Sequence, residues 1–375
     1  MNLTARQARR LSARWRRAER RVRDLDEAVT RLGTWRDEWQ ARREIARAVS
    51  GHGPILVGPW LSEVGYEVLY WVPFLRWVQA EHRVDPARFV IVTRGGASLW
   101  YEGLGTRRVE IFDQMTPDMF AAGNARRSAQ GRGTVKQFDV EAMDEQVLAH
   151  ARHEADVPDA SVLHPSLMYR LFQQFWLGHR APGMLERHTR YQCLSGAAGR
   201  LADGSLAGLP DLPSGYVAVK FYTAASLPPT EEGHALVNTL VRALAARWPV
   251  VTLDTGFTLD DHADYGVADA GRVVSLRKHL RPADNLAVQT AVIARARAFV
   301  GTCGSLAWLA PLLGVETTAV YTDARFLHGH LQVARRAYQA AGAARFSPLD
   351  LSALGPLGLT LAALPGLPAG TGTSS

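Results

Sequence analysis

Glycine and small polar residues gather in one turn near the end of the chain, within residues 298–323. The segment reads AFVGTCGSLAWLAPLLGVETTAVYTD, and its apolar ends predict two buried strands on either side of a short helix. A glycine-flanked turn before a helix leaves backbone N–H groups without partners, and an anion can bind there. A diphosphate fits such a turn, and so does a carboxylate or a water molecule. The turn therefore predicts an anion site built from Gly301, Thr302, Gly304 and Ser305.

Charged and polar residues stand at other predicted strand ends of the same half. Lys220 ends a core strand, where a lysine is costly unless its ammonium group reaches solvent or an anion. Arg277 and Lys278 follow a later strand and predict either a solvated loop or neutralisation of a diphosphate. The hydroxyls of Thr302 and Ser305 either donate to the same ligand or cap the helix. Tyr222 is a further polar residue expected near the diphosphate. Asp254, His262 and Asp323 stand where the base or ribose of a nucleotide could bind.

Two carboxylates in the first half could act as a general base. Glu67 is predicted in the first turn of a buried helix and Glu63 in the turn before it, and a helix N-terminus stabilises a carboxylate. Such a group can remove a proton from a hydroxyl in the transition state. The alternative is that Glu67 only starts the helix and Glu63 only closes the turn. Trp60 and Arg94 are expected beside them, where they could line an acceptor site, although Trp60 could equally pack in the core.

Several common chemistries lack their sequence signatures. The chain has no G-x-G-x-x-G after a strand, no P-loop, no G-x-S-x-G and no H-E-x-x-H. Its D-x-D, at Asp24 and Asp26, falls in a predicted helix, and His328-Gly329-His330 has poor spacing for a closed metal site. We therefore expect no bound metal. Cys193 and Cys303 are the two cysteines, so no disulfide framework is predicted and a cytoplasmic protein is the simplest expectation.

Strands and helices alternate in both halves, which predicts an α/β fold. In the first half, strands are expected at 54–58, 88–93 and 107–112, and a buried helix at 66–82 with a kink at Pro73, followed by mostly helical sequence over 115–195. The second half predicts a parallel doubly wound sheet, whose ligands bind beyond the carboxyl ends of its strands. Its five strands are expected at 216–221, 250–254, 272–276, 298–301 and 317–321, with helices near 231–247, 284–296 and 304–313.

The chain is longer than one hydrophobic core usually supports, so two lobes are expected among its 375 residues. The predicted division is a helical arm (1–50), a first α/β lobe (51–195), a linker rich in glycine, alanine, serine and proline (196–215), a second α/β lobe (216–347) and a low-complexity tail (348–375).

The net charge of +7 is concentrated at the N-terminus. Residues 1–47 hold 14 of the 43 basic residues and 7 of the 36 acidic ones, which leaves 29 of each for the rest of the chain. A heptad pattern of apolar residues runs from Leu11 to Leu32. It predicts a helix packed on the body, a self-associating coiled coil, or an arginine-rich helix on anionic lipid. No basic surface continues into the body, so nucleic acid is not an expected partner. No apolar run reaches the length of a membrane span, so a peripheral position on the inner membrane face is the furthest membrane contact expected.

Three segments resemble a known enzyme fold. Residues 284–323, DNLAVQTAVIARARAFVGTCGSLAWLAPLLGVETTAVYTD, resemble the donor-binding lobe of GT-B glycosyltransferases, and VAVKFY with VVTLDTG resembles the first two strands of that lobe. SEVGYEVLYWVPFLRW, at 62–77, is similar to the opening strand-turn-helix of the heptosyltransferase-like members. The resemblance implies a GT-B-like fold, in which two Rossmann-like lobes face a cleft, with an acceptor in the first and a nucleotide sugar in the second.

The sequence therefore predicts a metal-independent glycosyltransferase without a cofactor. It would move a sugar from a nucleotide-diphosphate donor to a hydroxyl of a polysaccharide, glycolipid or glycan, and the resemblance implies an inverting reaction. One alternative is a sugar-nucleotide epimerase or a pyruvyl transferase on the same fold. Another is an inactive, transferase-like scaffold protein that recruits partners through a coiled-coil arm.

Overall fold

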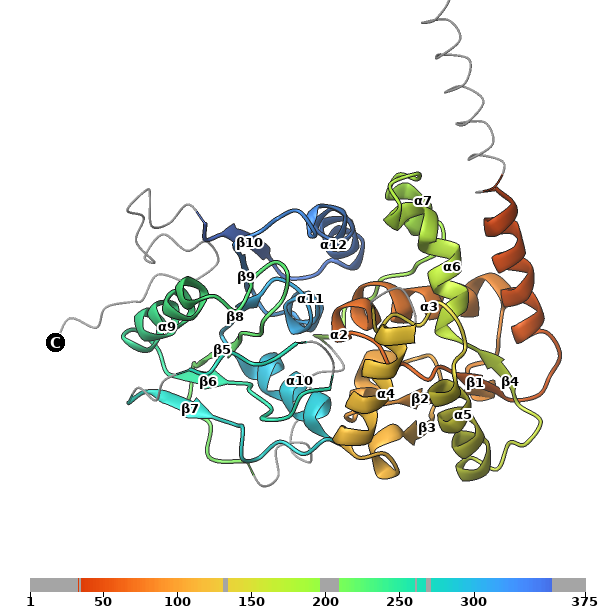
Figure 1. The fold of residues 1–375 in the computed structure, drawn as a ribbon, viewed down its shortest axis with the longest axis horizontal. Helices are drawn as coiled ribbons and strands as arrows, with labels where there is room; N and C mark the ends of the chain where they lie inside the picture. The colour runs from red at the N-terminus through yellow and green to blue at the C-terminus, as the bar shows by residue number, and fades with distance from the viewer. Residues whose placement is uncertain are drawn as a thin grey trace, which may run out of the picture.

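The computed structural model describes residue 33 and residues 35–130, 134–195, 209–259, 262–267 and 271–352. Within these, the chain forms two α/β lobes side by side (Figure 1). The predicted heptad helix and most of the predicted tail lie outside the described residues, and so does 196–208 of the linker. Residues 35–49 form a helix that leads into the first lobe.

The first lobe is built on four parallel strands in the order β3-β2-β1-β4. Strands β1 (Ile55–Val57) and β2 (Phe89–Thr93) are buried along their whole length, because their residues are apolar on both faces. These two and β3 (Arg107–Glu110) match predicted strands. The fourth strand, β4 (Ser161–Leu163), falls in sequence that we expected to be mostly helical, since three residues are too few to show a pattern. Three longer helices follow β3: α4 (Pro117–Gln130), α5 (Ala142–Glu154) and α6 (Pro165–Trp176). The short α7 (Gly183–Glu186) comes after them.

The helix after β1 has three parts that run on without a break. It opens as α2 (Val64–Tyr66), widens into a π-helical turn over Glu67–Trp71, and continues as α3 (Val72–His82). The kink predicted at Pro73 is therefore a wide turn just before the proline, whose ring has no N–H and needs room against the preceding turn. Such π-helical turns are frequent at functional sites.

The second lobe has six parallel strands in the order β10-β9-β8-β5-β6-β7. Five match the predicted strands, and the parallel α/β fold of the lobe is confirmed. They are β5 (Val217–Lys220), β6 (Val250–Thr252), β7 (Val273–Ser275), β8 (Ala298–Thr302) and β9 (Thr317–Tyr321). The helices are α9 (Glu231–Ala245), α10 (Asn285–Arg295), α11 (Leu306–Leu309) with a 3-10 turn at Ala310–Leu313, and α12 (His328–Ala341).

The sixth strand, β10 (Phe346–Asp350), crosses the predicted boundary between lobe and tail. It pairs with β9, and Leu351 after it is 3% exposed, so the prediction that the tail begins at 348 was wrong. Pro348 argues against a strand in the sequence because proline cannot donate to a ladder. It is tolerated here because β10 is at the edge of the sheet.

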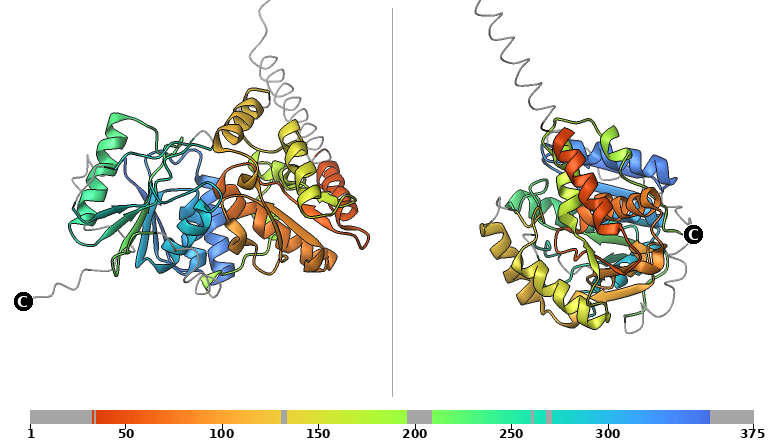
Figure 2. Two further views of the ribbon diagram at one scale, coloured as in Figure 1. Left: turned by 90° about the horizontal axis from the view of Figure 1, so that it is seen from below. Right: turned by 90° about the vertical axis from the view of Figure 1, so that its right-hand side faces the viewer.

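Each lobe has an apolar cluster of its own, and a larger one runs across both. A continuous apolar cluster includes Val68 and Leu69 of the first lobe together with Leu306 and Leu309 of the second. The left view of Figure 2 shows the two lobes side by side from below. None of the helices in the described residues is long and apolar enough to cross a membrane.

Candidate functional site

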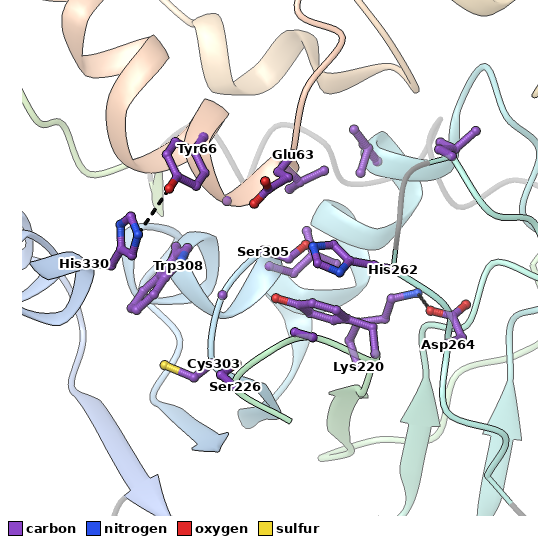
Figure 3. A pocket seen from close by; sticks show the side chains of 18 of the residues that line it. Glu63, Tyr66, Lys220, Ser226, His262, Asp264, Cys303, Ser305, Trp308 and His330 are labelled. Atoms are coloured by element: carbon purple, nitrogen blue, oxygen red, sulfur yellow. Dashed lines mark hydrogen bonds and ion pairs between the residues drawn. The ribbon is translucent and has the colours of Figure 1, made fainter. Parts of the chain in front are cut away.

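A cavity of about 550 Å³ lies between the lobes. It opens beyond the carboxyl ends of β5 and β8 and is covered on the first-lobe side by the start of α2 (Figure 3). Its volume is typical of a site for a small molecule. The predicted site residues that line it are Glu63, Arg94, Lys220, Tyr222, His262, Gly304 and Ser305.

Lys220 ends β5 and is 8% exposed at the wall of the cavity. Its Nζ lies 2.5 Å from Asp264 Oδ1 and donates to the Leu253 carbonyl at 3.0 Å. Asp264 is itself held by the backbone N–H of Thr255, at 2.7 Å. A lysine ammonium has three donors, so two are used within the protein and one remains for a ligand. Asp264 lines the cavity but was not predicted, because its loop carries no motif.

The turn after β8 reaches the cavity with its second half. Gly304 and Ser305 line the wall, and both have positive φ, +144° and +41°. A Cβ at Gly304 would collide with the hydroxyl of Tyr222, which explains why glycine is required there. Figure 3 shows Ser305 beside His262 and facing Glu63 across the cavity.

Gly301 and Thr302, in contrast, join two strands and do not line the cavity. A Cβ at Gly301 would collide with the backbone carbonyl of Lys220. The Thr302 hydroxyl accepts from the backbone N–H of Tyr222 at 3.0 Å and donates to its carbonyl at 2.9 Å. Both residues fix the end of β8 against the end of β5, so the prediction that they contact the ligand is corrected.

Four further predicted donor-site residues are also outside the cavity. Asp254 is 8% exposed behind Lys220, and burial raises its pKa to about 6 against the opposing effect of that lysine. Arg277 and Lys278 are exposed, as expected if they belong to a solvated loop and do not neutralise a diphosphate. Asp323 pairs with Arg325 at 2.6 Å. These residues follow β6, β7 and β9, whereas Lys220 and the turn of Gly304 and Ser305 follow the two central strands, β5 and β8.

Of the two candidate bases, Glu63 lines the cavity and Glu67 does not. Glu63 has an extended backbone before α2 and is half-buried at the cavity wall. Glu67 is completely buried, and Tyr101 Oη donates to its Oε1 at 2.5 Å. Its Oε2 finds no hydrogen-bond partner among the described residues. Glu63 can therefore reach a ligand in the cavity, whereas Glu67 is enclosed in the core, contrary to its predicted position at the site.

Burial raises the pKa of Glu67 to about 7, although the nearby Arg94 and the Tyr101 hydroxyl oppose the shift. A carboxyl whose pKa is higher in the folded than in the unfolded chain stabilises the fold fully below the unfolded pKa. That stability is lost as the pH rises through the folded pKa. We expect the free energy of unfolding to fall between pH 4.5 and about 7, and Glu67→Gln to remove on the order of 2–3 kcal/mol of that fall. Urea titrations of both proteins at several pH values measure the free energy of unfolding. If it fell with pH as steeply in the variant as in the unmodified protein, the raised pKa of Glu67 would be contradicted.

Arg94 and Trp60 support the turn that carries Glu63. Arg94 lines the cavity, is 2% exposed and donates through Nη2 to the Ser62 carbonyl at 2.5 Å. Trp60 is fully buried, stacks on Trp71 with ring centroids 5.8 Å apart, and donates through Nε1 to the Glu63 carbonyl at 3.2 Å. Trp60 is therefore a core residue that does not contact the cavity, and its predicted acceptor contact is corrected.

Sequence reasoning missed a histidine–tyrosine cluster at the end of the cavity. His330 of α12 has its Nδ1 2.5 Å from Tyr70 Oη and its Nε2 3.2 Å from Tyr66 Oη. Burial lowers the pKa of His330 to about 4, so the ring is neutral at pH 7. Lys136 lies over the Tyr66 ring at 4.5 Å and also lines the cavity. No group of three metal-type ligands occurs in the part of the chain that the structure describes.

Gly65 brings the two lobes together at the cavity. A Cβ at this position would be 2.9 Å from Ser305 N and 3.1 Å from Trp308 Cδ1. The first distance is too short, and Ser305 N is a backbone atom that cannot move aside by a change of rotamer. Gly65→Ala is therefore expected to push α2 away from the turn after β8 and to cost about 1–3 kcal/mol of unfolding free energy. Thermal unfolding of this variant beside Gly53→Ala, where a Cβ meets nothing within 4 Å, measures it. Equal melting temperatures for the two variants would refute the close contact.

Comparison with known proteins gives structural neighbours only. No protein-family model matches the chain, and no curated protein matches it. A family 9 glycosyl transferase from Veillonella parvula matches with a TM-score of 0.39 and 13% identity, over 83% of this chain and 89% of that one. The E. coli heptosyltransferase WaaC with ADP gives 0.39 and 15%, over 81% and 98%. A UDP-N-acetylglucosamine 2-epimerase gives 0.32 and 12%, over 82% and 87%. The neighbours include heptosyltransferases, the class of glycosyltransferase that the sequence resembles.

Proposed function

We propose that this chain is a glycosyltransferase that binds a nucleotide-diphosphate sugar in the cavity between its lobes and transfers the sugar to a hydroxyl acceptor. The observation that carries this proposal is the meeting of Lys220 and Ser305 of the second lobe with Glu63 of the first around one cavity. One wall offers donors for a leaving diphosphate, and the facing wall offers a carboxylate for the attacking hydroxyl.

The charge of the cavity favours an anionic donor. Three cationic side chains, Arg94, Lys136 and Lys220, line it against two carboxylates, Glu63 and Asp264. Arg94 and Lys220 are buried, and buried cations stabilise phosphate oxygens strongly, because little water competes for them. These cations can neutralise a diphosphate, so we propose that the enzyme needs no metal for transfer.

The transfer we propose is a single displacement. Glu63 takes the proton of the acceptor hydroxyl while the oxygen of that hydroxyl bonds to the anomeric carbon of the donor. The bond from that carbon to the β-phosphate oxygen breaks, and its electron pair leaves with the nucleoside diphosphate. Lys220 and the backbone at Gly304 and Ser305 face the oxygen on which charge develops. The anomeric configuration is inverted in such a step.

Isothermal titration with UDP, GDP, ADP and CMP in the presence of EDTA tests the donor site. Binding of UDP, GDP or ADP without metal is expected. Failure of all three to bind, or binding of the monophosphate CMP alone, would refute the assignment. Incubation with sugar nucleotides then tests the reaction. Isomerisation of a sugar nucleotide without any acceptor would show an epimerase in place of a transferase, and binding without any turnover would show an inactive scaffold.

The partners proposed for the reaction are the nucleotide sugar and a carbohydrate or glycolipid acceptor. Membrane contact or self-association through residues 1–47 is a separate proposal, because the heptad segment lies outside the described residues. Deletion of residues 1–32 separates the two and keeps the helix at 35–49, whose Ala41 and Ile45 are buried in the core. A lower sedimented mass supports a coiled coil, and loss of binding to anionic liposomes supports a cytoplasmic enzyme held at the membrane surface.

A further inference from the structure

The loop of residues 59–63, which ends at Glu63, is held by a buried side chain of the first lobe. Gln137 has no exposed surface, accepts from the backbone N–H of Leu61 at 2.8 Å, and donates to the carbonyl of Pro59 at 2.8 Å. Two hydrogen bonds to neighbouring peptide groups leave the loop little freedom. The start of this loop is therefore anchored in the first lobe, two residues before Glu63.

Asn124 of α4 holds the same loop and also reaches the second lobe. It is 2% exposed, and its Nδ2 donates to the carbonyl of Leu61 and to the carbonyl of Leu259, each at 3.1 Å. Leu259 belongs to residues 255–259, which we call the nucleotide loop because Thr255, Phe257 and Leu259 line the cavity. One side chain thus joins the two loops that carry the opposite walls of the site.

The chemistry of this bridge requires the amide nitrogen. Two carbonyl oxygens from different lobes are joined by the two N–H donors of one NH₂ group, which fixes the orientation of the amide. The other amide atom, Asn124 Oδ1, is buried without a hydrogen-bond partner among the described residues. An unpaired buried oxygen is costly, so packing alone does not favour an asparagine here.

The nucleotide loop is also tied to the proposed phosphate contact. Thr255 at its start donates its backbone N–H to Asp264 Oδ2 at 2.7 Å, and Asp264 Oδ1 lies 2.5 Å from Lys220 Nζ. A ligand that restricts the motion of Lys220 and Asp264 therefore also restricts the nucleotide loop. Through the two hydrogen bonds of Asn124, the loop of residues 59–63 is restricted as well.

We infer that Asn124 is a positioning residue that couples donor binding in the second lobe to the placement of Glu63 in the first. The inference rests on the proposed function, since it needs a donor at Lys220. Its consequence is that the base is set in place when the donor is bound, so that proton removal from an acceptor waits for the donor.

Hydrogen–deuterium exchange of the full chain, with and without saturating UDP, GDP or ADP, tests the coupling. In the unmodified protein, the nucleotide that binds is expected to slow exchange both in the nucleotide loop and in residues 59–67. In Asn124→Ala, the nucleotide loop is still protected, but the slowing in residues 59–67 decreases about fivefold, the change expected from losing one hydrogen bond. With a donor and an acceptor, kcat falls by about the same factor while the donor KM stays within twofold.

Gln137→Ala is the matched control, because it loosens the same loop without touching the second lobe. It is expected to speed exchange in residues 59–67 with and without nucleotide and to keep the nucleotide-induced slowing. Asn124→Ser, which retains one donor, serves if the alanine variant does not fold, and is expected to retain part of the slowing. Full slowing of residues 59–67 in both Asn124 variants would overturn the inference. Absence of protection in the nucleotide loop of the unmodified protein would overturn the donor assignment, and this inference with it.

Discussion

Glu63→Gln is expected to lower the turnover number by about 10²–10⁴-fold, the range for loss of a general base. The amide has nearly the same shape but cannot accept the proton of the acceptor hydroxyl. Because Glu63 faces the cavity from the first lobe, whereas the proposed phosphate contacts are in the second, nucleotide affinity should change little. Initial rates at saturating donor and acceptor, together with calorimetric titration of the nucleotide, separate the two effects.

Glu67→Gln is the matched control for this prediction. It carries the same substitution four residues further along the chain, on a side chain that is completely buried behind the cavity. Its turnover is expected to stay within a few-fold of the unmodified protein. If Glu67→Gln abolished turnover and Glu63→Gln preserved it, the assignment of the base would be reversed.

The ambiguity between these two acids shows what the sequence could and could not predict. The sequence placed Glu63 in the turn before the buried helix and Glu67 in its first turn, and a carboxylate at either position can act as a general base. In the structure the helix begins at Val64, two residues earlier than predicted, and Glu63 before it is extended, with ψ at 139°. Glu67 starts the π-helical turn and points into the core. The start of a helix and a local widening are set by packing, which one sequence does not reveal.

The second lobe was easier to predict because its strands are apolar throughout and its central turn is distinctive. Lys220 and Ser305 followed from their positions at strand ends. Asp264 and His330, in contrast, come from a loop without a motif and from a helix that was not predicted. Tertiary contacts place them at the cavity: Asp264 pairs with Lys220, and His330 contacts Tyr70. The sequence therefore predicted the strand ends but not which of them face the other lobe.

Lys220→Met is expected to weaken nucleotide binding by about 10- to 100-fold, because the substitution keeps the apolar stem and removes the donor that we propose for the diphosphate. The same change leaves Asp264 without its partner at 2.5 Å. Removing one member of a fully buried ion pair costs about 3–5 kcal/mol; Asp264 is partly exposed, so the unfolding free energy should fall by less than this. Calorimetric titration and urea unfolding measure the two losses on the same preparation.

The double variant Lys220→Met/Asp264→Asn separates the phosphate contact from the ion pair. It removes the uncompensated carboxylate, so most of the lost stability should return, whereas nucleotide affinity should stay low because the ammonium group is still absent. Lys278→Met is the control for lysine loss in general, since Lys278 is exposed and does not line the cavity. Recovery of nucleotide affinity in the double variant would show that Lys220 acts only by holding Asp264, and the diphosphate would then have to be placed against the other cations of the cavity, Arg94 and Lys136.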